Sequence, residues 1–79
     1  MTLANAVKTR VKELLTERKI SLYKLERIGG ISPNTTKDLM AEKNKSVNLK
    51  TVMQIIRAFE MRASDFFDER FDSFDLDID

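Results

Sequence analysis

A chain of 79 residues can form one small domain, and 14 basic against 13 acidic residues give it a net charge of +1. The sequence contains no cysteine and no histidine, which excludes disulfide bonds, zinc–thiolate sites and the side chain that most often acts as a general base. We therefore expect no enzyme, no metal or other cofactor and no small-molecule substrate. No apolar run approaches the roughly 20 residues of a membrane span, and the N-terminus is too charged for a signal peptide. We expect a soluble, cytoplasmic protein.

The first helix is predicted over about residues 3–19. Apolar residues that recur at helical spacing predict its buried face: Val7, Val11, Leu14 and Leu15. The charged residues are expected on the solvent face: Lys8, Arg10, Lys12, Glu13, Glu17 and Arg18. Ile20 ends this helix, and Ser21 is a good N-cap for the next one.

A second, short helix is predicted after Ser21, with three apolar residues at helical spacing: Leu22, Leu25 and Ile28. The pair Gly29–Gly30 ends it, because glycine adopts positive φ without steric cost. Ile31 is a lone apolar residue that we expect to be buried in the turn.

A third helix is predicted to start at once, because Ser32 is an N-cap and Pro33 favours the first helical position. Leu39 and Met40 are expected to face inward and four polar residues outward: Asn34, Thr35, Lys37 and Asp38. Only about three residues separate the second helix from the third, so the two must cross steeply. The polar face of the third helix then projects in a shape that suits the major groove of DNA.

Two further helices are predicted after a polar loop at residues 42–47. Asn48 is the expected N-cap of the fourth helix, whose apolar face is Leu49, Val52, Ile55, Ile56 and Phe59. Ser64 is expected to cap a short fifth helix that contains Phe66 and Phe67. Five helices with no strand pattern before residue 70 predict an all-α domain.

The charge is distributed unevenly along the chain. Residues 1–64 contain 13 basic and 6 acidic residues, a net charge of +7. Residues 65–79 contain Arg70 and seven acidic residues, a net charge of −6. A basic body indicates a polyanionic partner.

The acidic C-terminal tail, residues 70–79, also carries apolar residues: Phe71, Phe74, Leu76 and Ile78. Spacings of four, three and four from Phe67 to Ile78 fit a helix, whereas the alternation in residues 74–79 fits a strand. Chain termini are also commonly disordered. Three interpretations stay open: a disordered or loosely packed tail, an extension of the last helix, or a strand that pairs with a second copy. The tail is too apolar to serve solvation alone. We therefore favour a tail that either packs onto the basic face of the domain or mediates dimerisation.

The chain resembles the Cro/lambda-repressor-like helix-turn-helix family, also called the XRE family, over about residues 8–68. The residues that carry the resemblance are Leu25, Gly30-Ile31-Ser32, Leu39, Lys43-Asn44-Lys45, Leu49-Lys50-Thr51 and Ser64-Asp65-Phe66-Phe67. The resemblance implies a compact five-helix lambda-repressor-like DNA-binding domain over residues 1–69, followed by the short acidic tail.

The resemblance also implies which residues touch DNA. The helix opened by Ser32 is the recognition helix of the family, and its exposed early residues reach base edges: here Pro33, Asn34, Thr35, Lys37 and Asp38. Asn can pair with adenine, Lys with guanine, Thr with thymine and Asp with cytosine N4. Phosphate contacts are expected from Ser32 and from the loop after the recognition helix: Lys43, Asn44, Lys45 and Ser46. The amides that open the second and fourth helices can also bind phosphate.

Three residues depart from the family pattern. Glu26 stands where the family has a small residue, so its carboxylate must reach solvent or find a donor. Thr36 replaces a β-branched apolar residue, and its hydroxyl is expected to bond back to the carbonyl of Ser32. Leu22 replaces a phosphate-binding Gln, so one phosphate contact is expected to be missing.

Two functions are consistent with the sequence. The first is a sequence-specific regulator of transcription, a small bacterial or prophage repressor that binds the major groove of double-stranded DNA as a homodimer. The alternative is a protein-interaction module of the same fold, an antitoxin-like or antirepressor partner that does not read DNA. Glu26, Asp38 and the acidic tail favour the alternative, and the basic body favours the repressor.

Overall fold

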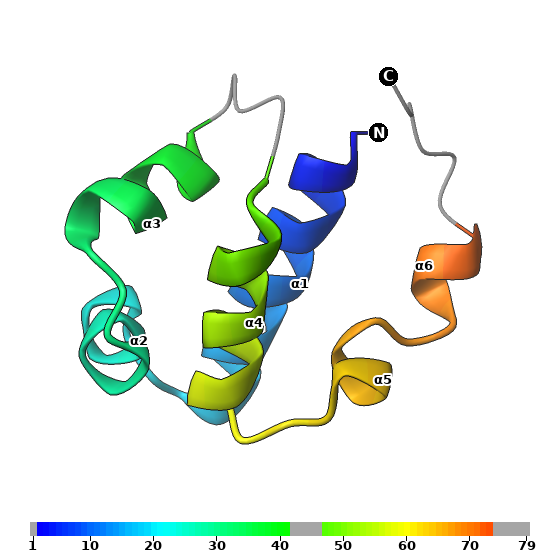
Figure 1. Ribbon diagram of the computed structural model, residues 1–79. Coiled ribbons are helices and arrows are strands. Elements are labelled where there is room, and N and C mark those ends of the chain that lie inside the picture. The colour runs from blue at the N-terminus through cyan, green and yellow to red at the C-terminus, as the bar shows by residue number, and fades with distance from the viewer. Residues whose placement is uncertain (1, 42–46, 74–79) are drawn as a thin grey trace.

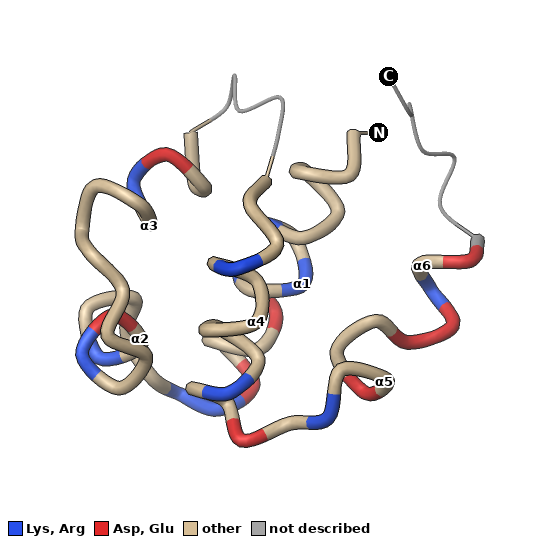
Figure 2. The backbone as a smooth tube through the Cα atoms, viewed as in Figure 1, with Lys and Arg blue, Asp and Glu red and all other residues tan. Residues whose placement is uncertain are grey.

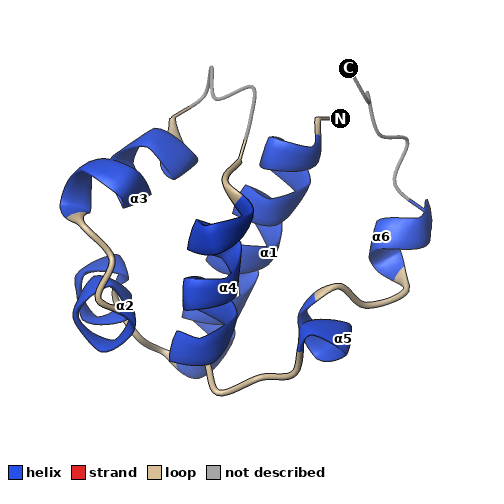
Figure 3. Cartoon of the chain, in the orientation of Figure 1, coloured by secondary structure: helices blue, strands red, loops and turns tan. Residues whose placement is uncertain are grey.

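The computed structural model describes residues 2–41 and 47–73. The regular elements of these ranges are six helices (Figure 1): α1 Leu3–Arg18, α2 Leu22–Gly29, α3 Pro33–Met40, α4 Leu49–Ala58, α5 Ala63–Phe66 and α6 Arg70–Ser73. The predicted all-α fold is confirmed, and α6 adds one helical turn to the five helices expected. Figure 3 shows that helices make up most of the described residues and that loops join them.

Capping side chains set where the helices begin. Ser21, Ser32 and Asn48 each accept a backbone N–H from the first turn of α2, α3 and α4, so these three predicted N-caps are confirmed. The prediction for Ser64 was wrong, because α5 already begins at Ala63 and follows Arg62, which makes no side-chain capping bond. Phe67 lies just past the end of α5.

The core forms where α2 packs against α3 and α4, α1 reaches α3, and α4 meets α5. Its buried residues come from every helix from α1 to α5 and from the turn before α3: Val7, Val11, Leu14, Leu25, Ile31, Leu39, Val52, Ile55, Ile56, Ala58, Phe59 and Phe66. The expectation for Ile31 is confirmed. Leu15 and Leu22 pack against this core from partly buried positions.

Two apolar residues that were predicted to be buried are exposed. Ile28 is 53% exposed, because Gly29 and not Ile28 faces α4. A Cβ placed at Gly29 would lie 3.2 Å from that of Ala58 and 2.9 Å from Cδ1 of Ile31. Leu49 is 70% exposed, because it opens α4 almost a full turn before the first buried apolar residue of that helix, Val52.

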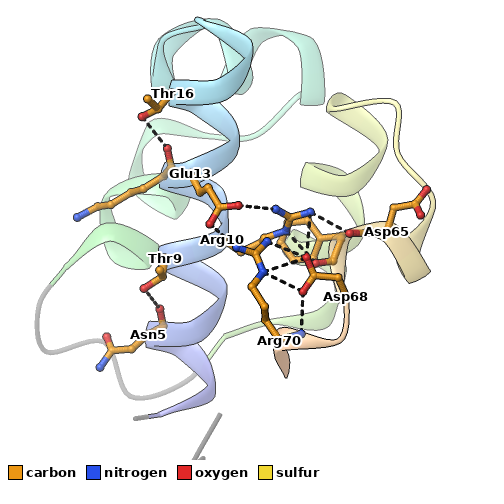
Figure 4. A network of polar contacts seen from close by, with 10 residues as sticks. Asn5, Thr9, Arg10, Glu13, Thr16, Asp65, Asp68 and Arg70 are labelled. Atoms are coloured by element: carbon orange, nitrogen blue, oxygen red, sulfur yellow. Dashed lines mark hydrogen bonds and ion pairs between the residues drawn. The ribbon is translucent and has the colours of Figure 1, made fainter. Parts of the chain in front are cut away.

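Arg10, expected on the solvent face of α1, is only 9% exposed, and this prediction was wrong. Its guanidinium donates from Nε to the carbonyl of Phe66 at 3.0 Å and from Nη2 to that of Asp65 at 2.9 Å. Nη1 bonds Glu13 at 2.9 Å (Figure 4). Arg10 therefore ties the middle of α1 to the end of α5, which explains why a charged residue is buried.

Arg70 extends the same network to α6. Its Nη1 lies 2.5 Å from Glu13 Oε2 and its Nη2 lies 2.7 Å from Asp68 Oδ2. The hydrogen bonds from Arg70 hold the pKa of both carboxyl groups below their ordinary values. The ring of Phe71 stands edge-on to that of Phe67, with centroids 5.0 Å apart. Residues 70 and 71 are thus attached to the body of the domain by an ion-pair network and by aromatic contacts.

Candidate nucleic-acid interface

The turn between α2 and α3 is built around one left-handed residue. Gly30 has φ of 62° and its amide donates to the backbone carbonyl of Glu26, which ends α2. Gly29 is still helical, so the two glycines serve different purposes: Gly30 supplies positive φ, and Gly29 permits close packing. Ile31 is buried next, and Ser32 caps α3 immediately afterwards. Figure 1 shows the resulting steep crossing of α2 and α3.

The first turn of α3 holds two hydroxyl groups in contact with each other. Ser32 Oγ accepts the backbone N–H of Thr35 at 3.2 Å, and the two side-chain oxygens lie 2.8 Å apart. Whichever hydroxyl donates to the other, one hydroxyl proton is left for an outside acceptor. A phosphate oxygen is an acceptor of this kind.

The outer face of α3 is polar, as predicted. Thr35 is half-buried, and its hydroxyl contacts that of Ser32. The other four residues are exposed: Pro33, Asn34, Lys37 and Asp38. Leu39 is buried and Met40 is partly buried against the core. The five residues expected at base edges therefore belong to the first turn and a half of one helix, with four of them open to a ligand.

Two of the departures from the family pattern contact each other. The buried hydroxyl of Thr36, on α3, donates to the half-buried carboxylate of Glu26, on α2. Its oxygen also lies 3.0 Å from the carbonyl of Pro33, so the expected bond to the carbonyl of Ser32 was wrong by one residue. The donor that the Glu26 carboxylate needs is therefore the Thr36 hydroxyl, within the helix-turn-helix itself. This bond satisfies a carboxylate that lies half-buried between the two helices.

Lys8 holds the other end of α3. Its Nζ lies 3.5 Å from the carbonyl of Ala41, which follows the last residue of α3. A cation at a helix C-terminus satisfies a free carbonyl and interacts favourably with the helix dipole. The sequence places Lys8 on the outer face of α1, and nothing in its spacing indicates a partner 33 residues away.

Of the residues expected at phosphates, Ser32 is placed beside the exposed start of α3, and Lys43, Asn44, Lys45 and Ser46 lie outside the described residues. The amide of Lys24 is used by the Ser21 cap and that of Lys50 by the Asn48 cap. Other first-turn amides of α2 and α4 remain for a phosphate. Leu22 is partly buried against the core and offers no side-chain donor.

The two sides of the domain differ in net charge (Figure 2). Around the helix-turn-helix, two acidic residues, Glu26 and Asp38, are outnumbered by the exposed basic residues Lys24, Arg27, Lys37 and Lys50. On the α5–α6 side, two basic residues, Arg62 and Arg70, are outnumbered by the acidic residues Asp65, Asp68, Glu69 and Asp72. A polyanion is therefore attracted to the side of α2, α3 and α4 and repelled from the side of α6.

Of the acidic tail, only residues 70–73 are described, and Phe71 packs on the domain's own aromatic residues. Phe74, Leu76 and Ile78, the other dimerisation candidates, lie outside the described residues. Within residues 2–41 and 47–73, no helix is long and apolar enough to cross a membrane, and no group of three acidic residues is arranged to hold a metal ion.

Comparison with known families matches residues 10–71 to the Cro/C1-type HTH DNA-binding domain. The match covers most of the chain, including the whole helix-turn-helix and the Arg10 network. No match was found among curated proteins or among solved structures. The chain belongs to the Cro/C1-type helix-turn-helix family of DNA-binding domains.

Proposed function

We propose that this protein is a sequence-specific transcriptional repressor, of bacterial or prophage origin, that acts by occupying an operator. The observation that carries the proposal is the exposed polar face of α3, which starts directly after the capped turn and bears Asn34, Lys37 and Asp38. Occupancy needs no catalytic group, in keeping with a sequence that lacks histidine and cysteine.

Each exposed residue of α3 has a defined chemistry at base edges in the major groove. Asn34 can donate to and accept from the N7 and N6 positions of adenine, and Lys37 can donate to O6 and N7 of guanine. Asp38 can accept from cytosine N4 and disfavours bases that present only acceptors. The free hydroxyl proton of the Ser32–Thr35 pair suits a phosphate next to the recognised bases.

Two copies are needed for a selective site, because one recognition helix contacts only a few base pairs. Family members with this motif bind as dimers to two half-sites about one helical turn apart. We propose a homodimer on a two-fold symmetric operator, with phosphate contacts from Lys43, Asn44, Lys45 and Ser46 around each recognition helix. Residues 70–79 are proposed as the part of the chain that joins the copies.

The assignment of roles is tested with two substitutions. Asn34→Ala should change which sequence is preferred, at a cost of about 1–3 kcal/mol on the original operator. Lys45→Ala should weaken binding to all duplexes alike and reduce the slope of log affinity against log salt by about one. The measurement is fluorescence anisotropy with operator and random duplexes over a range of salt concentrations, with Glu17→Ala on exposed α1 as the control. Equal losses on both kinds of duplex for Asn34→Ala would contradict its role in base reading.

One of the arguments for a protein-interaction module is weakened by the contacts of Glu26. Glu26 was a reason to doubt DNA reading, and its carboxylate is bonded by Thr36 inside the fold. Asp38 remains on the outer face of α3 as a residue that a protein partner could use. A generic duplex separates the two functions, since affinity that falls steeply with salt supports DNA binding and no binding at low salt supports a protein partner.

A further inference from the structure

The outer face of α2 carries an exposed apolar surface that the proposed contacts with DNA do not use. Tyr23 is 66% exposed and Ile28 is 53% exposed, although both are large and apolar. They line a surface hollow of about 490 Å³ together with Lys24 and Arg27, which we call the α2 hollow. At the helical spacing of about 100° per residue, these four residues cover an arc of about 140°, opposite the buried Leu25.

The α2 hollow is basic as well as apolar. Among the described residues, neither Lys24 nor Arg27 forms an ion pair. The Arg27 guanidinium lies 5.9 Å from the centre of the Tyr23 ring, which leaves its N–H groups available to an acceptor. A ligand that fits this surface combines apolar side chains with negative charge.

The sequence contains a segment of this composition. In residues 74–79, Phe74, Leu76 and Ile78 alternate with three aspartates. An extended segment with this pattern presents its apolar side chains on one face and its carboxylates on the other. We propose that residues 74–79 of a second copy of this chain dock in the α2 hollow, with apolar side chains against Tyr23 and Ile28 and aspartates beside Lys24 and Arg27.

The length of the segment favours docking between copies over docking within one chain. Six fully extended residues span at most about 20 Å, and the longest dimension of the fold is 31 Å. α6, from which the segment continues, lies on the opposite side of the domain from α2 (Figure 1). In a two-fold symmetric dimer each copy gives one segment and one hollow, so two identical contacts form.

The inference rests on the two-copy assembly of the proposed function and is independent of how bases are read. The first test measures the dimer dissociation constant of the full chain by analytical ultracentrifugation. Ile28→Asp in the hollow and Leu76→Asn in the segment should each weaken the dimer by about tenfold or more, because both remove apolar contact. Leu49→Asp is the matched control, since Leu49 is an equally exposed apolar residue outside the hollow, and it should leave the constant within about twofold.

A mixture of the two variants shows whether the segment of one copy docks in the hollow of another copy. The Ile28→Asp copy keeps an intact segment and the Leu76→Asn copy keeps an intact hollow, so a mixed dimer retains one of the two contacts. The mixture should therefore associate more tightly than either variant alone. A wild-type dimer unaffected by either substitution, or a mixture that gains nothing, overturns the proposed docking.

Two further outcomes separate this proposal from the proposed function. A wild-type chain that stays monomeric at about 100 µM overturns both the docking and the two-copy assembly. Binding to a duplex with a single half-site should be the same for the wild type and for Leu76→Asn, which leaves the helices proposed to meet DNA unchanged. Failure of the wild type to bind that duplex counts against DNA reading and leaves the docking result standing.

Discussion

At the scale of single residues, the contact between Glu26 and Thr36 defines this helix-turn-helix. Families with this motif usually place a small residue and a β-branched apolar residue at these two positions, where α2 and α3 touch. Here a carboxylate and a hydroxyl replace both, and the hydroxyl donates to the carboxylate. Each departure alone leaves a polar group in the contact, whereas together they satisfy each other.

This pairing predicts strongly non-additive substitutions. Thr36→Val should destabilise the domain by about 1–3 kcal/mol, because the half-buried Glu26 carboxylate loses its donor. Glu26→Ala should cost less, since Thr36 can still donate to the carbonyl of Pro33. The double variant should recover most of the loss from Thr36→Val, measured by urea unfolding as a double-mutant cycle. Additive losses would show that the two side chains are not coupled.

Spacing along the chain could not predict contacts between residues that are distant in sequence. Helical spacing puts Arg10 among the charged residues of α1, but its carbonyl partners lie 55 and 56 residues further on. Lys8 likewise meets the end of α3, 33 residues away. Spacing along one helix predicts which side of that helix is apolar. The spacing contains no information about backbone carbonyls that a distant segment places next to the helix.

At the scale of elements, local chemistry decides where the helices start and stop. The caps Ser21, Ser32 and Asn48 were predictable, because an N-cap acts on the first turn of its own helix. The end of α1 was less obvious, because Lys19 takes the left-handed conformation at φ of 55° that glycine usually provides. The exposure of Ile28 depends on which face of α2 meets α4, which only the assembled fold decides.

The strained end of α1 gives a prediction with a matched control. Lys19→Gly should stabilise the domain by about 0.5–1 kcal/mol, because glycine adopts positive φ without the steric cost that Lys19 bears. Lys12→Gly, at an exposed position inside the same helix, should destabilise it by about 1 kcal/mol. Thermal unfolding of both variants measures whether each substitution stabilises or destabilises the domain. A loss of stability with Lys19→Gly would argue against the left-handed end of α1.

At the scale of the whole molecule, the two sides of the domain differ in net charge. The helix-turn-helix side is basic and the α5–α6 side is acidic, and Arg10 and Arg70 join α1 to that acidic side. The network keeps α6 packed against α1 and away from α3, the helix that is proposed to meet DNA.

This network predicts how stability changes with pH. The pKa values of Glu13 and Asp68 are lowered in the folded protein from ordinary values of 4.5 and 3.8, mainly by hydrogen bonds from Arg70. Their stabilising contribution is therefore present above the ordinary values and is lost as the pH falls through the lowered ones. Arg70→Gln should reduce stability at pH 7 and much less at pH 3. Arg62→Gln is the control, since its pair with Asp65 is largely exposed and should contribute little at either pH. If Arg70→Gln reduced stability equally at both pH values, its effect would not come from pairing with the ionised Glu13 and Asp68.

Selection of bound duplexes from a random pool shows whether α3 reads DNA. If it does, the enriched sequence should consist of two inverted half-sites about one helical turn apart, and Asn34→Ala should enrich a different sequence. A pool that shows no enrichment with the wild-type protein, or the same enriched sequence with Asn34→Ala, would contradict DNA reading by α3.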